Sequence, residues 1–211
     1  MDWSVSYFDG FDLFPDLQLA GFRASGVDLV LTHHRVRVVG VDAAAPVGPY
    51  TVRGEAAYTF TEHARRGDQI KSPFFFMVLG ADRTLPGAVY VNLQYVLRVI
   101  SDFESPEDVE DPVRRGLAVE QALINDQLDE IKHAIALRVS TTWLHETLRG
   151  EMTAIISPTR GDYALRAKMT YALTDHVKLT AGGDLFGGQT QSVFGRLRDT
   201  STAYLEVRWD F

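Results

Sequence analysis

The strongest constraint on the fold of this chain is a two-residue alternation of apolar and polar side chains that recurs along its length. In residues 89–99, for example, the odd positions read Val, Val, Leu, Tyr, Leu, Val, whereas the even positions include Asn, Gln and Arg. Successive side chains of a β-strand point to opposite faces, so this pattern predicts strands with two chemically different faces. The pattern recurs in residues 3–8, 28–44, 50–60, 74–82, 89–99, 132–143, 148–156, 162–172, 176–185 and 203–211.

Segment length and loop length narrow the fold class. Most segments have about nine to twelve residues, against five or six for a typical strand, and a membrane-spanning strand needs about nine to eleven. The connections alternate between short (45–49, 83–87, 144–147, 173–175) and long (9–27, 61–73, 101–131, 186–200), with 157–161 of moderate length where a long one is expected. All short turns therefore share one end of the sheet, as in bacterial outer-membrane barrels. We expect an all-β fold, an antiparallel up-and-down transmembrane β-barrel of about ten strands.

The last strand carries the most specific motif. Leu205, Val207, Trp209 and Phe211 place apolar residues at alternate positions and end on an aromatic residue. This resembles the C-terminal assembly signal of bacterial outer-membrane β-barrel proteins. The resemblance implies a location in the bacterial outer membrane and recognition of this strand by the barrel-assembly machinery.

A wider resemblance covers residues 3–16, 40–60 and 80–99, which look like the C-terminal half of porin-like channels of the alginate-export type. That family has more than ten strands and a cleavable leader, whereas Met1 is followed directly by an alternating strand with neither a basic nor an apolar leader segment. The expectation is one β-barrel domain over residues 1–211, the C-terminal part of a longer barrel, with ten strands forming an incomplete barrel.

The polar faces of the segments are rich in cations. A charge on the lipid side of a barrel costs about 2–4 kcal/mol, so these residues are expected to face the lumen. The nine cations are Arg53, Arg98, Lys132, Arg138, Arg149, Arg166, Lys168, Lys178 and Arg208, and the five anions are Glu55, Glu151, Asp184, Glu206 and Asp210. The excess of about four cations would grow if Arg35 and Arg37 also faced inward.

This inward face has two interpretations. The charges either form cross-strand ion pairs that stiffen the barrel or line a path that attracts anions, and both can hold at once. We expect a passive, porin-like channel for small anionic solutes such as acidic saccharides, bounded by outer-membrane lipid. The expected solute contacts are Arg53, Arg98, Arg138, Arg149, Arg166, Lys168 and Arg208. The alternatives are a non-conducting structural barrel and a soluble ligand-binding β-barrel.

Residues 101–131 form a long acidic loop, with ten acids against Arg114 and Arg115. Its second part, from Val119 to Ile131, has apolar residues at roughly helical spacing. The loop is either a solvated outer loop or a gate that folds back into the lumen and is held by the basic wall.

Other functions find little support in the sequence. The absence of cysteine excludes thiolate metal sites and cysteine nucleophiles, and the net charge of −7 disfavours nucleic-acid binding. No catalytic motif joins the available serine, histidine and aspartate residues, and no Gly-rich phosphate loop is present. The adjacent His33 and His34 point opposite ways on a strand, and the acids around Glu110 do not match a calcium loop. We therefore expect neither an enzyme, nor a cofactor, nor a metal site.

Overall fold

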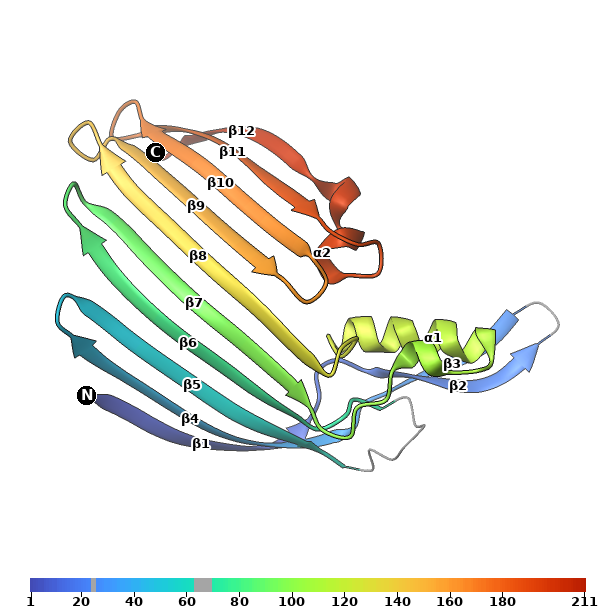
Figure 1. Cartoon of the computed structure of the whole chain (residues 1–211). Coiled ribbons are helices and arrows are strands. Elements are labelled where there is room, and N and C mark those ends of the chain that lie inside the picture. Colours follow the sequence, from blue (N-terminus) through green and yellow to red (C-terminus); the bar gives the residue numbers. More distant parts are fainter. Residues whose placement is uncertain (24–25, 63–69) are drawn as a thin grey trace.

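The structure is a computed structural model that describes residues 1–23, 26–62 and 70–211. Its main element is a sheet of ten strands in which every neighbouring pair is antiparallel (Figure 1). In spatial order the strands are β1 (Asp2–Phe11), β4 (Arg35–Val47), β5 (Tyr50–Thr61), β6 (Phe74–Leu85), β7 (Val89–Ile100), β8 (Ile131–Trp143), β9 (Leu148–Ser157), β10 (Asp162–Ala172), β11 (Val177–Gly187) and β12 (Thr202–Trp209). The predicted all-β antiparallel fold is confirmed, but the sheet is not closed into a barrel.

Two further strands correct the expectation for residues 9–44. The predicted long connection 9–27 contains β2 (Asp16–Arg23), and the predicted single strand 28–44 divides into β3 (Gly26–Thr32) and β4. The chain leaves β3 at His33 and His34, and β2 and β3 pair only with each other as a separate two-stranded sheet. Residues 28–32 and 35–44 both alternate, so the alternation alone did not reveal the break between them.

The connections lie as the loop lengths predicted. The two-residue connection between β4 and β5 lies at the same end of the sheet as both chain termini, and the other short turns share that end (Figure 1). The opposite end, which we call the long-loop end, carries the β2–β3 hairpin and the loop 101–130 with η1 (Pro106–Asp108) and α1 (Pro112–Ile124). It also carries the β11–β12 connection with α2 (Val193–Arg196) and η2 (Arg198–Thr200).

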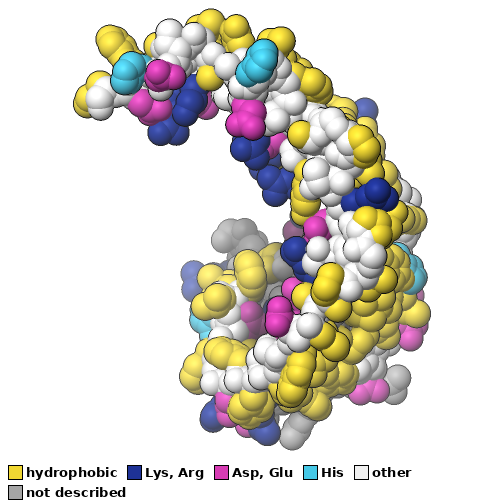
Figure 2. Space-filling model, turned by 90° about the vertical axis from the view of Figure 1, so that its left-hand side faces the viewer, with side chains coloured by type: hydrophobic (Ala, Val, Ile, Leu, Met, Phe, Trp, Pro, Cys, Tyr) yellow, Lys and Arg dark blue, Asp and Glu magenta, His cyan; other side chains and the backbone are white. Residues whose placement is uncertain are grey.

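The ten-stranded sheet curves into an open trough. Charged side chains of both signs line the inner, concave side, and hydrophobic side chains cover much of the outer, convex side (Figure 2). Within the described ranges, no second layer packs against the convex side, where Val5, Leu79, Leu93 and Leu205 are each about half exposed or more. Between β1 and β12 the trough is open, so these two strands are its edges.

The chain buries unusually little apolar surface. A compact monomer of 23.6 kDa exposes about 9,800 Å², whereas this chain exposes 13635 Å². Among the described residues, the buried apolar side chains other than Pro106 are Val36, Ile100, Leu123 and Leu128, and all five lie at the long-loop end or in the loop 101–130. The longest described helix, α1, has thirteen residues, and no described helix is long and apolar enough to cross a membrane.

Candidate functional site

The concave face of the sheet is the candidate site. Residues directly opposite in an antiparallel register share a face. The register joins Arg166 to Thr153 and Asp184, and it joins Lys168 to Glu151. Followed across all ten strands, it places the seven predicted solute contacts on the concave face, namely Arg53, Arg98, Arg138, Arg149, Arg166, Lys168 and Arg208.

Glu151 on β9 organises the densest cluster of charges. Its Oε1 lies 2.6 Å from Arg149 Nη2 and 3.9 Å from Arg138 Nη2, while its Oε2 accepts from Lys168 Nζ at 2.9 Å. The Glu151 side chain is only 15% exposed, whereas those of Arg138 and Arg149 are 53% and 56% exposed. A single carboxylate thus orients three cations whose outer N–H groups still face the trough.

Arg166 on β10 extends this cluster. Its Nε lies 2.5 Å from Asp184 Oδ1 on β11. We call Arg138, Arg149, Arg166 and Lys168 the basic patch. Its four cations face only Glu151 and Asp184, which leaves a formal excess of two positive charges.

The remaining predicted contacts lie apart from the basic patch. Arg53 Nη2 on β5 lies 3.0 Å from Asp82 Oδ1 on β6. At the other edge, Arg208 Nε lies 2.8 Å from Asp210 Oδ1, and Lys178 Nζ lies 3.8 Å from Asp210 Oδ2. The structure therefore unites four of the seven residues and separates Arg53, Arg98 and Arg208.

The expected excess of four inward cations is wrong for the whole face. Asp42 on β4 and Asp82 on β6 share the concave face, and Asp126 reaches its wall from the loop 101–130. Asp42, Glu55 and Asp82 make the β4–β6 flank acidic around Arg53, whereas the basic patch makes β8–β10 positive. Continuing the alternation through residues 42 and 82 of the sequence would have found both aspartates.

Arg35 and Arg37 do not add to the inward charge. They alternate with Val36 and Val38, and the register puts them on the convex face with Asp9 and Phe60. Arg35 Nε donates to Asp9 Oδ1 at 2.6 Å, at the long-loop end of the sheet. Both arginines therefore lie on the convex face at the long-loop end of β4, where the apolar part of that face ends.

Arg98 ties the loop 101–130 to the concave wall. Its Nη1 donates to Asp126 Oδ2 at 2.9 Å and to the carbonyls of Asn125 and Asp126, while Lys132 Nζ approaches Asp126 Oδ1. The guanidinium also lies 4.8 Å from the ring centre of Phe74 and 5.3 Å from that of Phe76, as in a cation–π contact. Because only 18% of its side chain is exposed, Arg98 serves the loop more than the open trough.

The buried carboxylate of Asp16 joins the same loop to the β2–β3 hairpin. Asp16 is 2% exposed, and its Oδ1 accepts from the side-chain amides of Gln121 and Asn125 and from the backbone N–H of Lys71. His34 Nδ1 lies 2.8 Å from Oδ2. Burial of a carboxylate is costly unless it is hydrogen-bonded, so these partners hold three separate connections together.

The loop 101–130 also contacts the three remaining connections at the long-loop end, which join β5 to β6, β9 to β10 and β11 to β12. Gln127 exchanges two hydrogen bonds with the backbone of Ser72 before β6. Arg160 between β9 and β10 donates to Asp129 at 2.8 Å. Arg196 of α2 makes a two-pronged ion pair with Glu120 at 2.7 and 2.8 Å.

These contacts refine the two interpretations of the acidic loop. The loop does contain a helix, but α1 spans Pro112–Ile124, so the helical prediction for Val119–Ile131 is confirmed only as far as Ile124 and is wrong beyond it. The loop is anchored to the basic wall through Asp126, as the gate hypothesis requires, but its gating role stays a prediction. The described residues contain no group of three or more potential metal-ligating side chains.

The residues of the predicted assembly signal lie on an open edge. Leu205, Val207 and Trp209 point to the convex side of β12 and are strongly exposed, and Phe211 follows the strand. The recognition of this strand by an assembly machinery stays a prediction. Comparison of the chain with protein-family models, curated proteins and solved structures finds no match.

Asp16→Ala is expected to release the hairpin and α1 from one another. The substitution leaves the side-chain amides of Gln121 and Asn125 without their buried acceptor. Each unsatisfied amide should lower the stability of this region by about 1–3 kcal/mol. Hydrogen exchange followed by mass spectrometry should accelerate by about a hundredfold in residues 16–23 and 112–125 and stay unchanged in β9–β11. Asp28→Ala, in the same hairpin but at an exposed ion pair, is the control. Equal protection in Asp16→Ala and wild type would contradict this role.

The ion pair between Glu120 and Arg196 is expected to fail in acid. The hydrogen bond from Arg196 lowers the pKa of Glu120 below its ordinary value of 4.5. A lowered carboxyl pKa contributes stability above pH 4.5, and this contribution is lost as the pH falls through the lowered value. Glu120→Gln should therefore reduce the free energy of unfolding at pH 7, by less than about 1 kcal/mol for so exposed a pair, and make a smaller difference at pH 3.

Denaturant unfolding of wild type and Glu120→Gln at the two pH values measures this difference. Glu110→Gln changes an acid of the same loop for which the described structure gives no ion pair, so it should have no effect at either pH. A difference between wild type and Glu120→Gln that is as large at pH 3 as at pH 7 would rule out the proposed electrostatic origin.

Proposed function

We propose that this chain is an outer-membrane β-barrel protein, or the C-terminal part of one, that acts as a passive channel for small anionic solutes. The proposal gives each face of the sheet an environment: lipid outside and water inside. Its partners are outer-membrane lipid, an anionic solute and, through the resemblance of residues 203–211, the barrel-assembly machinery.

The distribution of charge on the convex face carries the proposal. In the ten strands, all described, the convex charged residues and histidine lie within three residues of a strand end. They are Asp9, Arg35, Arg37 and His133 at the long-loop end and Arg83 at the short-turn end. The band between them is uncharged, as a lipid-facing surface must be, because a charge at the bilayer midplane costs about 2–4 kcal/mol.

Aromatic side chains support the same orientation. Trp143, Tyr171 and Trp209 lie at the short-turn ends of their strands, and Phe60 and Tyr163 lie at the long-loop ends. All five are 40% exposed or more, although a soluble protein would gain by burying them. Rings at both rims of an apolar band are typical of the two lipid–water interfaces.

Insertion into lipid sets a requirement for β1 and β12. An unpaired backbone N–H or C=O costs several kcal/mol in hydrocarbon, so neither edge can remain open there. The two edges are antiparallel to each other, since ten strands alternate in direction across the sheet. They can thus pair with each other or with further antiparallel strands, and the proposal requires one of these closures.

The basic patch supports passage of anions. The four cations of the basic patch present exposed N–H groups, and they exceed their acidic partners by two charges. Arg138, Arg166 and Lys168 lie at mid-strand on β8 and β10, whereas Arg149 lies at the short-turn end of β9. Guanidinium groups bind carboxylates in a two-pronged geometry, so carboxylate-bearing solutes, acidic saccharides among them, suit this patch.

A second candidate, a non-conducting structural barrel, rests on the completeness of the ion pairing. Each of the nine strand cations on the concave face has a carboxylate oxygen within 4.0 Å. Such a network stiffens a wall without requiring a solute. The two functions differ in whether the inserted protein conducts ions.

The membrane location is tested by moving one lysine between the two faces of β8. Val139→Lys puts a charge in the middle of the convex band, whereas Ser140→Lys puts it on the concave face opposite Glu151. We expect wild type and Ser140→Lys to refold into phospholipid vesicles and float with them. The equilibrium constant for insertion of Val139→Lys should be lower than that of wild type by at least about thirtyfold, which corresponds to a free energy of at least about 2 kcal/mol. Equal behaviour of the two lysine variants would refute a lipid-facing convex side.

Charge reversal in the basic patch tests the channel. Arg138→Glu combined with Arg166→Glu should move the selectivity of the inserted protein from anions toward cations, as a reversal-potential measurement in a planar bilayer detects. Arg114→Glu combined with Arg198→Glu makes the same change of charge outside the strands. This control should shift the ion selectivity far less. Unchanged anion preference in the patch variant would eliminate the anion path, and absence of any conductance would favour the structural barrel.

A further inference from the structure

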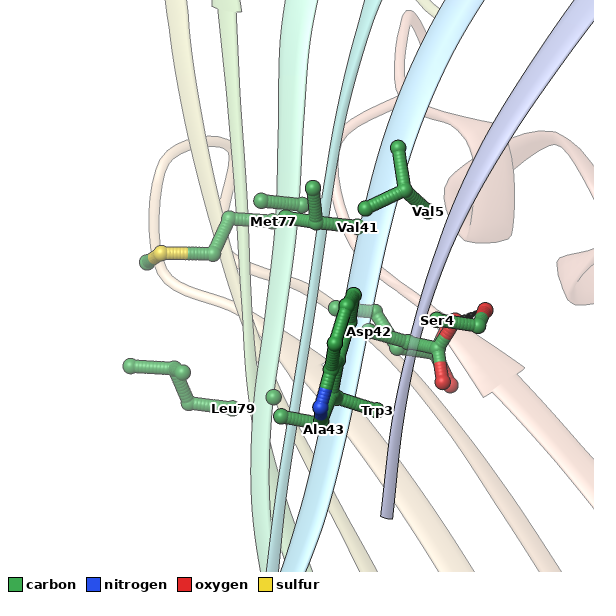
Figure 3. A pocket seen from close by; sticks show the side chains of 11 residues that line it. Trp3, Ser4, Val5, Val41, Asp42, Ala43, Met77 and Leu79 are labelled. Atoms are coloured by element: carbon green, nitrogen blue, oxygen red, sulfur yellow. Dashed lines mark hydrogen bonds between the residues drawn. The ribbon is translucent and has the colours of Figure 1, made fainter.

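A shallow groove with a volume of about 310 Å³ runs over the convex face where β1, β4, β5 and β6 lie side by side (Figure 3). Trp3 and Val5 form one wall and Met77 and Leu79 the other. The polar atoms of Ser4 and Asp42 point away from it, so the groove is lined by apolar groups (Figure 3).

The strand register explains why the face is hollowed here. One row across the four strands reads Trp3, Ala43, Gly54, Leu79, and the next reads Val5, Val41, Ala56, Met77. In the first row the larger Trp3 and Leu79 on the outer strands enclose Ala43 and Gly54, and in the second row Ala56 on β5 is the smallest side chain. At Gly54 an added Cβ would lie 3.2 Å from Leu79 Cδ2, so a larger residue at that position would begin to fill the groove.

Beyond the groove, toward the short-turn end of the sheet, the convex face leads to Arg83. The next row contains Ala45, Val52 and Ala81, and beyond it Arg83 lies beside Tyr50. The Arg83 guanidinium carbon is 5.2 Å from the centre of the Tyr50 ring, and Nη1 donates to the Tyr50 hydroxyl at 3.3 Å.

Arg83 lies on β6, the strand that carries Met77 and Leu79, and like Arg37 on β4 it has no ion pair among the described residues. It is half-buried on the convex face, and no carboxylate in the described part of the chain lies within 4.0 Å of its guanidinium. By contrast, Arg35 on the same face is paired with Asp9. Four residues of strand separate Arg83 from Leu79, a span of about 13 Å at 3.3 Å per residue.

We propose that this groove binds one phospholipid, with an acyl chain between Trp3 and Leu79 and the headgroup phosphate on Arg83. The site rests on the proposed membrane location and adds a defined lipid to it. The apolar groove can bind only the hydrocarbon part of a lipid, and an unpaired guanidinium at the lipid–water interface can bind its phosphate. An anionic headgroup such as phosphatidylglycerol is favoured over phosphatidylcholine, because it leaves the phosphate charge uncompensated.

Trp3 lines the groove and serves as the reporter. The chain has three tryptophans, so Trp143→Phe with Trp209→Phe leaves Trp3 as the only indole. This protein is refolded into phosphatidylcholine vesicles that contain a few per cent of lipid brominated on its acyl chains. Brominated phosphatidylglycerol should quench Trp3 at least about twofold more than brominated phosphatidylcholine at the same mole fraction.

Variants separate the site from general contact with lipid. Ala56→Leu fills the floor of the groove and Arg83→Gln removes the phosphate ligand, so each should abolish the preference for phosphatidylglycerol. Arg83→Lys keeps the charge and should retain part of it. Ala181→Leu adds the same bulk to the exposed convex face of β11 and should leave the preference intact.

The outcomes distinguish this site from the proposed function. Equal quenching by the two lipids, unaffected by Ala56→Leu, would overturn the lipid site while leaving membrane insertion in place. A self-association of wild type that Ala56→Leu abolishes would assign the groove to a second copy instead. If neither lipid quenches Trp3, or Trp209 in a Trp3→Phe, Trp143→Phe protein, the membrane location fails and the lipid site fails with it.

Discussion

The hydrogen-bonded ladder between antiparallel strands is the interaction on which the rest of this structure depends. Neighbouring strands pair their backbone groups in a single curved layer that is open at β1 and β12, and no described element packs on its convex side. A sheet in water normally gains its stability by burying one apolar face. Here that face is exposed, so the fold is complete only when something apolar covers it from outside.

Side-chain contacts across the fold are concentrated at the long-loop end. The loop 101–130 reaches the connections that contain Asp16, Ser72, Arg160 and Arg196, and it is fixed to the sheet through Asp126. The buried apolar side chains lie in the same region. The acidity of the loop, which looks like a solvated surface in the sequence, therefore supplies acceptors for cations from other connections.

Local alternation was sufficient to predict the ten main strands, because it depends only on neighbouring residues. The prediction failed for β2 and β3, because the alternating pattern was read as continuous across the turn at His33 and His34. The charge balance of the concave face was misjudged because Asp42 and Asp82 were not followed through their strands. Contacts such as that of Asp16 with Gln121 join residues more than a hundred positions apart, and no local pattern reports them.

The strict two-residue period also limits how these strands can change. Inserting or deleting one residue within β8 would exchange the faces of everything beyond it in that strand, which would carry Arg138 outward and bring Leu137 inward. A substitution alters one side chain, but a single insertion reverses a whole row. Insertions and deletions are therefore tolerable only in the turns and in the long loops, where they leave the two faces of each strand unchanged.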